Sequence, residues 1–145
     1  MKAVPVFGAL LLGVACATTS PVPIHAGDVC FNCRRTITDT QLAAEVIDDS
    51  AHAFKFSSVG CLTAYLRDHP QEGVKALFVT DYNAGKLFPA KDAHFVRFVV
   101  DPKVNALDYA AFRSESAAGA FAKEKRASVV RWDDARKDET ITHAD

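Results

Sequence analysis

Beyond its first residues the sequence lacks any apolar run of about 20 residues, the length that a helix needs to cross a membrane. It also lacks an excess of one charge, because 17 Lys and Arg residues stand against 18 Asp and Glu residues in 145 positions. That balance gives no strong field for nucleic acid or for a bare anionic membrane as the main partner. No Gly-x-Ser-x-Gly, His-Glu-x-x-His or phosphate-loop motif is present, so the sequence offers no hydrolytic centre.

The N-terminus has the pattern of an export signal, because Lys2 precedes a short apolar run that ends in small residues. We predict a signal peptide over residues 1–15. The segment Gly13-Val14-Ala15-Cys16 resembles a bacterial lipoprotein signal, in which the cysteine is acylated and becomes the first mature residue. We therefore expect a lipid anchor on Cys16 at the periplasmic face of a bacterial membrane. Ordinary cleavage at the same small residues, which would leave a soluble periplasmic protein, is the alternative.

Composition divides the mature chain into three parts. Residues 16–27 contain Pro21, Pro23 and Gly27 among small polar residues and are predicted to be a tether that holds the domain off a surface. Residues 28–135 carry the periodic apolar pattern of a folded domain, with 49% hydrophobic residues in the whole chain. The tail 136–145 is polar and aperiodic, and we expect it to be frayed.

Within the domain the same order of elements is predicted twice: strand, strand, helix, strand. Residues 56–65 and 112–121 lie in step, with Phe, Ser, Ala and an aromatic residue at matching positions. Each half is too small to bury its own sheet face, so we expect an α+β fold, a single compact domain of two repeated β-β-α-β halves. The expected strands are 41–47, 51–56, 74–79, 94–100, 109–112 and 128–132, and the expected helices are 58–68 and 114–125.

Cys30 and Cys33 bring two thiols within three residues at the start of the domain. Such a pair can close a small disulfide, cycle as a redox couple, or bind a soft metal such as Zn(II) or Cu(I). Because an exported protein meets an oxidising compartment, the structural disulfide is the plain alternative to a metal site. A metal-carrying pair is expected to be exposed on a surface turn.

Three further features could join this pair. Cys61 is expected at about the third residue of a helix capped by Ser58, where free N–H groups and the helix dipole would lower its pKa and favour a thiolate. A small buried apolar role for Cys61 is the alternative. His25 is the nearest histidine and could act as a ligand. Arg34 and Arg35 directly follow the pair and would favour thiolates, or would simply be solvated.

Several short motifs follow one another over residues 28–134. They are Asp28-x-Cys30-x-x-Cys33, Phe56-Ser57-Ser58-Val59-Gly60-Cys61-Leu62, Val79-Thr80-Asp81-Tyr82, Ala90-Lys91-Asp92-Ala93-His94, Ala111-Phe112-Arg113-Ser114 and Val129-Val130-Arg131-Trp132-Asp133. In their order and spacing these motifs resemble the NosL family, the lipoprotein accessory proteins of nitrous oxide reductase that are regarded as periplasmic copper chaperones. The resemblance implies two β-β-α-β halves related to the fold of organomercurial lyase, and a Cu(I) site of cysteine, methionine and histidine that delivers copper to the reductase.

The chain departs from this family in its methionines. Members commonly have Cys-Gly-Met where this chain has Cys33-Arg34-Arg35, and a methionine where it has Val104-Asn105-Ala106-Leu107. Met1, in the leader, is the only methionine, so no thioether can serve as a ligand in the mature chain. The implied copper site is therefore built from thiolates, with Cys30 and Cys33 as primary ligands and Cys61 or His25 as additional ones.

These observations favour a Cu(I)-binding metallochaperone that is not an enzyme. Its partner would be a periplasmic copper enzyme, and the resemblance implies nitrous oxide reductase. Two alternatives stay open: a thiol-disulfide redox protein, and a module without metal in which a Cys30–Cys33 disulfide staples the first turn. The sequence carries no expectation for the oligomeric state.

Overall fold

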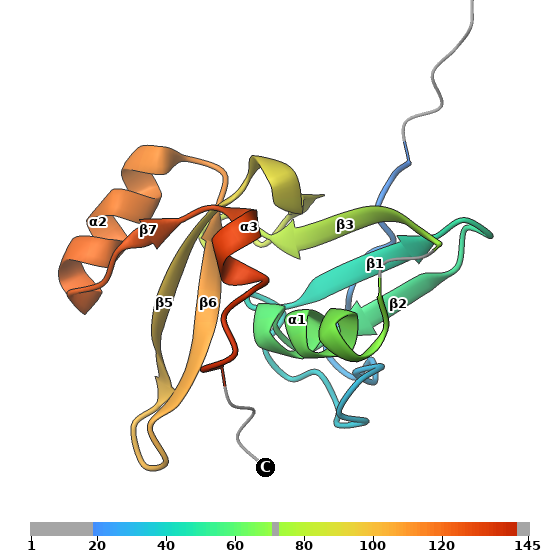
Figure 1. Cartoon of the computed structure of the whole chain (residues 1–145), viewed down its shortest axis with the longest axis horizontal. Helices are drawn as coiled ribbons and strands as arrows, with labels where there is room; N and C mark the ends of the chain where they lie inside the picture. The colour runs from blue at the N-terminus through green and yellow to red at the C-terminus, as the bar shows by residue number, and fades with distance from the viewer. Residues whose placement is uncertain (1–18, 71–72, 142–145) are drawn as a thin grey trace, which may run out of the picture.

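The computed structural model describes residues 19–70 and 73–141, which form two antiparallel sheets and a small number of helices (Figure 1). The predicted signal peptide and Cys16 lie outside the described residues. One sheet has the strand order β2-β1-β3-β4 and the other β6-β5-β7. The elements are β1 (Ala44–Asp48), β2 (Ala53–Phe56), α1 (Val59–Asp68), β3 (Val74–Thr80), β4 (Leu87–Pro89), η1 (Ala90–Asp92), β5 (His94–Asp101), β6 (Ala106–Phe112), α2 (Glu115–Lys125), β7 (Val129–Val130) and α3 (Trp132–Ala135).

The predicted internal repeat is confirmed by the topology. The units β1-β2-α1-β3 and β5-β6-α2-β7 follow the same order, and in each the first strand lies between the other two. The local chemistry is repeated as well. Phe56 and Phe112 end equivalent strands, and the side chains of Ser58 and Ser114 cap the helices that follow. The α+β fold class is therefore the one expected.

The two halves share a core, as predicted. One cluster of buried apolar side chains joins β1, β3 and α1 to β5 and β6, and it includes Cys30 and Cys61. A second cluster lies between α2 and the other face of β5 and β6. Backbone contacts also connect the sheets, because Asp81 bridges to Ala111 and the Tyr82 amide donates to the Ala111 carbonyl. Each sheet is therefore covered by other elements of the domain.

Several predicted boundaries are wrong. The first strand begins at Ala44 instead of residue 41, because Asp39 accepts a hydrogen bond from the Gln41 amide and forms a turn there. The last strand ends at Val130, since Trp132 opens the short helix α3. Strand β4 and the 3-10 turn η1 were not expected. No helix of the described residues is long and apolar enough to span a bilayer.

The N-terminal segment does not stand off the domain as a tether would. From residue 19 onward it lies along the first sheet, where the Val22 amide donates to the buried carboxylate of Glu45 at 2.9 Å. Ile24 packs against the core. Residues 19–27 are therefore part of the folded domain, and the expectation of a free tether over 16–27 is wrong for this portion.

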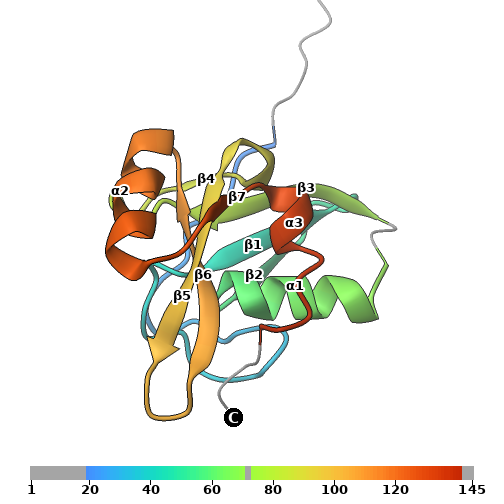
Figure 2. The same cartoon turned by 60° about the vertical axis from the view of Figure 1, so that its left-hand side comes forward.

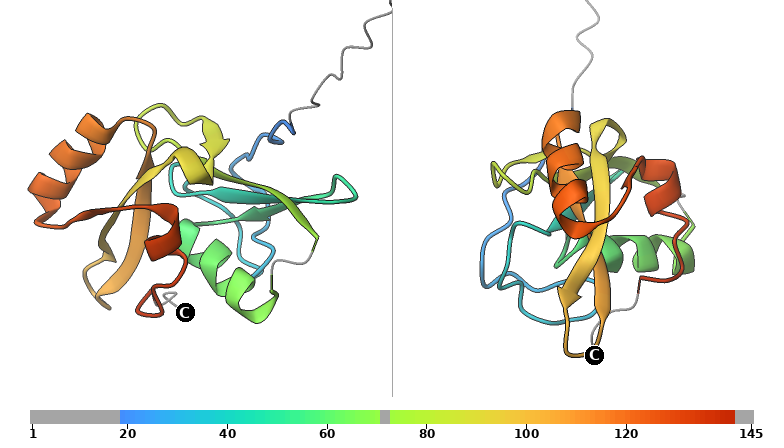
Figure 3. Two further views of the ribbon diagram at one scale, coloured as in Figure 1. Left: turned by 45° about the horizontal axis from the view of Figure 1, so that its top comes forward. Right: turned by 90° about the vertical axis from the view of Figure 1, so that its left-hand side faces the viewer.

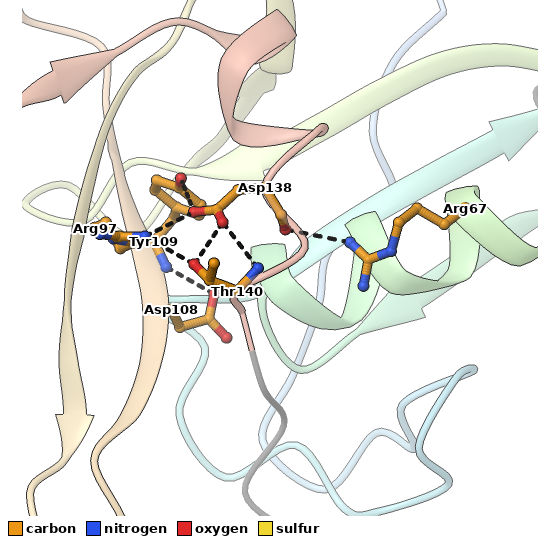
Figure 4. Close-up of polar contacts among 6 residues, drawn as sticks. All are labelled: Arg67, Arg97, Asp108, Tyr109, Asp138 and Thr140. Atoms are coloured by element: carbon orange, nitrogen blue, oxygen red, sulfur yellow. Dashed lines mark hydrogen bonds and ion pairs between the residues drawn. The ribbon is translucent and has the colours of Figure 1, made fainter.

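The C-terminal segment is also tied down, against the expectation that the chain frays from residue 136. Asp138 accepts hydrogen bonds from Tyr109 Oη at 2.7 Å and from Arg97 at 3.2 Å, and Ile141 is buried (Figure 4). Burial raises the pKa of Asp138, but hydrogen bonds from Thr140 and Tyr109 and the Arg97 charge outweigh it and lower that pKa to about 2. Residues 136–141 thus form a strap across β5 and β6.

Candidate metal centre

The Cys30-to-Cys33 stretch forms a tight loop closed by backbone hydrogen bonds. The Cys30 amide donates to the Arg35 carbonyl at 2.8 Å, and the Arg34 amide donates to the Cys30 carbonyl at 3.0 Å. Arg34 adopts a left-handed backbone with φ of 62°, which lets the chain reverse. The loop is fastened to the domain because the Phe31 amide donates to the Lys55 carbonyl of β2 at 2.7 Å. Cys30 and Cys33 are thereby held against the end of the first sheet.

Cys61 comes to the same place from the first turn of α1. The Ser58 hydroxyl accepts a hydrogen bond from the Cys61 amide at 3.1 Å, which makes Ser58 the N-cap as predicted. Cys61 is thus the third residue of the helix. Its thiol faces inward, with only 3% of the residue exposed.

Within the described part of the chain, Cys30, Cys33 and Cys61 form a group whose sulfur atoms all lie within 4.8 Å of one another. None of the three forms a disulfide within the described residues. Three sulfurs at this separation are the donor set that a soft, low-coordinate ion such as Cu(I) prefers. The packing of α1 against the loop therefore brings together the three cysteines that the sequence singled out.

Ser57 lies at the middle of this group, which the sequence analysis did not anticipate. Its hydroxyl donates to Cys61 Sγ at 3.2 Å and lies 3.8 Å from Cys33 Sγ. Ser57 also lies close enough to Cys30 that its amide lowers the pKa of that thiol. The residue reaches all three thiols because it lies in the bend between β2 and α1, four residues before Cys61.

The three thiols do not ionise independently, because each removed proton leaves a charge beside the others. A hydrogen bond from Cys61 lowers the pKa of Cys30 to about 4; burial opposes this shift, and the amides of Cys33 and Ser57 strengthen it. The same contact with Cys30, together with burial, raises the pKa of Cys61. The prediction that the helix start lowers the pKa of Cys61 is therefore wrong, because burial and the contact with Cys30 raise it.

The group is reached through a pocket of about 240 Å³ that is lined by Cys33 and Cys61. Cys30 has no exposed surface, whereas Cys33 is half-buried. The expectation of a pair exposed on a surface turn is thus wrong for Cys30 and only partly met by Cys33. Cys33 is the sulfur that an incoming group meets first.

Asp108 of β6 ties the helix start to the second half of the molecule. Its carboxylate accepts hydrogen bonds from the amides of Gly60 at 2.8 Å and Tyr109 at 2.7 Å, and it lines the same pocket. A Cβ atom at position 60 would lie 2.8 Å from this carboxylate and 2.5 Å from Ile141 Cγ2, so the close approach requires glycine. The placement of Cys61 therefore depends on contacts from both halves and from the C-terminal strap.

Among the described residues, none of the other positions proposed from the sequence belongs to the three-sulfur group. His25 is exposed and is not part of the three-sulfur group, and its backbone amide donates to Asp28 at 2.9 Å. The guanidinium of Arg34 stacks over the Phe31 ring at 5.0 Å, while Arg35 lines the pocket. Cys16 lies outside the described residues. A ligand role for His25 stays a prediction.

Leu107 of β6 also lines the pocket beside Cys33 and Cys61. It belongs to the stretch in which related sequences are expected to carry a methionine. The position is thus at the site, and an aliphatic side chain occupies it here. Neither Leu107 nor Asp108 could be found from spacing, because both are more than 40 residues from the nearest cysteine in the chain.

Comparison with known proteins agrees with this architecture. A family model described as NosL matches residues 21–140. No curated protein gives a significant match to the sequence. Among solved structures, the chain is similar to the crystal structure of the copper chaperone NosL from Shewanella denitrificans, with a TM-score of 0.66 and 20% sequence identity, over 88% of this chain and 99% of that one. At this identity the likeness establishes the fold.

Proposed function

This chain belongs to the NosL family, and we propose that it is an exported Cu(I) carrier that binds one copper ion through Cys30, Cys33 and Cys61 and delivers it to a periplasmic copper enzyme. The observation that carries the proposal is the group of three cysteine sulfurs within 4.8 Å of one another. The similar structure from Shewanella denitrificans is described as a copper chaperone, which supports the choice of metal. The family resemblance points to nitrous oxide reductase as the client.

The unequal burial of the sulfurs suggests a route for transfer. Cys30 and Cys61 are buried, whereas Cys33 is half-buried and is the more exposed of the two cysteines that line the pocket. A thiolate or imidazole of the acceptor can enter beside Cys33 and bind the ion before the two inner sulfurs release it. No covalent chemistry is needed, so the role is that of a carrier and not of an enzyme.

The location follows from the leader. Acylation of Cys16 would hold the protein at the periplasmic face of a bacterial membrane, with the folded domain beginning only a few residues later. The chain would cross the membrane before it is acylated, so its site would take up copper outside the cytoplasm. A soluble periplasmic form is the alternative.

The test is an anaerobic Cu(I) titration of the reduced protein against a chromophoric chelator. We expect one equivalent to bind tightly, with the affinity reduced strongly in Cys33→Ser and Cys61→Ser and abolished in the Cys30→Ser/Cys33→Ser double variant. Cys16→Ser is the matched control, because it removes the one cysteine outside the group. Unchanged affinity in the double variant would refute the proposal.

The same titration decides the role of His25. If its imidazole joins the site, His25→Ala weakens copper binding while His52→Ala does not, because His52 lies in an exposed turn where it pairs with Asp48. Equal affinities for the two variants would remove His25 from the ligand set. The three sulfurs would then be the whole protein contribution.

A thiol-disulfide redox role is the second candidate. It is less well supported, because Cys30 is fully buried and no helix starts at the Cys30–Cys33 pair. If the protein fails to compete for Cu(I), the reduction potential of the pair becomes the informative measurement. A value below about −300 mV would indicate a structural disulfide, and a higher value would indicate a redox couple.

A further inference from the structure

A groove of about 480 Å³ lies beside the first described residue, Thr19, far from the thiol pocket in the fold. It follows the part of β3 that β4 leaves uncovered, since β4 pairs only with residues 78–80. Among the residues that the structure describes, its lining contains two lysines and the single tryptophan of the chain, and no carboxylate. The lining residues are Thr19, Val74, Lys75, Ala76, Leu77, Phe78, Pro89, Lys91 and Trp132.

No acidic side chain of the described residues pairs with the lysines of this groove. Lys75 and Lys91 are both exposed, and neither takes part in an ion pair found among the described residues. Arg131 adds a third charge at the rim, where it donates to the Lys91 carbonyl at 3.0 Å. Asp92 and Asp133 are neighbours in sequence but do not line the groove. The surface therefore suits an anionic partner.

The length of chain between Thr19 and the predicted anchor identifies that partner. Two residues lie between Cys16 and Thr19, which makes three steps from one Cα atom to the next; a fully extended chain spans at most about 3.6 Å per step, so the two Cα atoms are at most about 11 Å apart. That distance is close to the Debye length of about 8 Å at physiological ionic strength. A lipid on Cys16 therefore brings the bilayer surface within electrostatic reach of the groove.

We propose that the groove beside Thr19, through Lys75, Lys91 and the neighbouring Trp132, docks on anionic phospholipid headgroups and holds the anchored protein in one orientation. The proposal rests on the lipid anchor included in the proposed function. The net charge of −1 is too small to recruit the protein to a membrane. Once the anchor supplies proximity, however, two or three local charges are sufficient to select the face that contacts the lipid.

This orientation has a consequence for copper transfer. In two views, β3 and α3 lie on the side from which the described chain starts, whereas α1 and the loop before β1 lie on the opposite side (Figures 1 and 2). The right-hand view of Figure 3 agrees, with α3 in red above α1 in green. The thiol pocket is built from that loop, α1 and β6, so docking would turn it away from the bilayer. A water-soluble acceptor could then approach Cys33 freely.

The sole tryptophan makes the proposal testable with the full acylated chain. The protein is reconstituted on vesicles of phosphatidylcholine and phosphatidylglycerol that contain a lipid with a nitroxide on its headgroup, and Trp132 fluorescence is recorded. We expect quenching that disappears in Lys75→Glu/Lys91→Glu, because each lysine favours the docked orientation by about fivefold. Lys103→Glu is the matched control, since Lys103 lies in the turn between β5 and β6 and does not line the groove.

Each outcome is decisive. Quenching in the parent protein and in Lys103→Glu, lost in the double variant although that variant still sediments with the vesicles, supports the proposal. Equal quenching in all three, or none in the parent, overturns it, and so does parent protein that stays in the supernatant. The Cu(I) titration of the double variant should match the parent, because neither lysine lines the thiol pocket. A failure of docking is thereby separated from a failure of copper binding.

Discussion

Replacing Asp108 by alanine should destabilise the protein and loosen the copper site together. The carboxylate accepts hydrogen bonds from the Gly60 and Tyr109 amides, at 2.8 and 2.7 Å, in a buried position. Without it, two buried N–H groups lose their acceptor at a cost of about 1–3 kcal/mol each. Relief from burying a charge offsets part of that cost. We expect a net loss of about 3 kcal/mol in the free energy of unfolding, or about 10 °C in Tm for a domain of this size.

The assay is urea unfolding of the parent and the variants followed by circular dichroism, with Cu(I) affinity measured on the same samples. Asp101→Ala is the matched control, because Asp101 accepts one bond from the Lys103 amide at 2.9 Å in an exposed turn and should cost less than about 1 kcal/mol. Asp108→Asn keeps an acceptor oxygen and should fall between the two. If Asp108→Ala lost no more stability than Asp101→Ala, the Asp108 carboxylate would not be the stabilising acceptor described here. Copper affinity should fall with stability, because Gly60 precedes Cys61.

Three smaller perturbations test other contacts. Ser57→Ala should lower the Cu(I) affinity about fivefold, because it removes a hydrogen bond of about 1 kcal/mol to thiolate sulfur, and Ser57→Thr should restore it in the chelator competition. Tyr109→Phe should cost about 1–2 kcal/mol at neutral pH in urea unfolding. Because the pKa of Asp138 is about 2 in the folded chain against an ordinary 3.8, its stabilisation is complete above pH 4 and is lost as the pH falls towards 2, and Tyr109→Phe should shrink that acid-dependent loss. Burial raises the pKa of Glu45, so the folded chain binds its proton more tightly than the unfolded chain does, and stability falls as the pH rises above 4.5. Glu45→Gln should therefore stabilise the protein at pH 7 but not at pH 4, whereas exposed Glu139→Gln should change neither value.

Local sequence patterns were sufficient for the repeated architecture. The apolar run that becomes β3, the serines that cap α1 and α2, and the matching phenylalanines before them depend on neighbours in the chain, and each prediction is confirmed. The predicted boundaries were wrong where a turn or a short helix lies next to a strand. Asp39 forms a turn before β1, and α3 begins at Trp132 soon after β7 ends.

The terminal segments were predicted from composition, and composition does not show whether a segment packs against the domain. Residues 19–27 and 136–141 look polar or proline-rich in sequence. Each segment nevertheless packs an apolar side chain against the core and forms a hydrogen bond with a residue that is distant in the sequence. Such pairings join residues more than 20 positions apart. They exist because the sheets bring together groups that the chain order keeps separate.

The chemistry of the centre divides in the same way. The identity of the candidate donors follows from sequence, since the only methionine is Met1, outside the described domain, and cysteine thiols are the remaining soft ligands. Their number, burial and ionisation follow from packing. Cys61 joins Cys30 and Cys33 because Asp108 and the Ser58 cap hold the start of α1 against the cysteine loop, and the resulting contact lowers the pKa of Cys30 and raises that of Cys61. Distances of a few ångströms between residues 30 positions apart depend on the whole fold, because no local pattern encodes them.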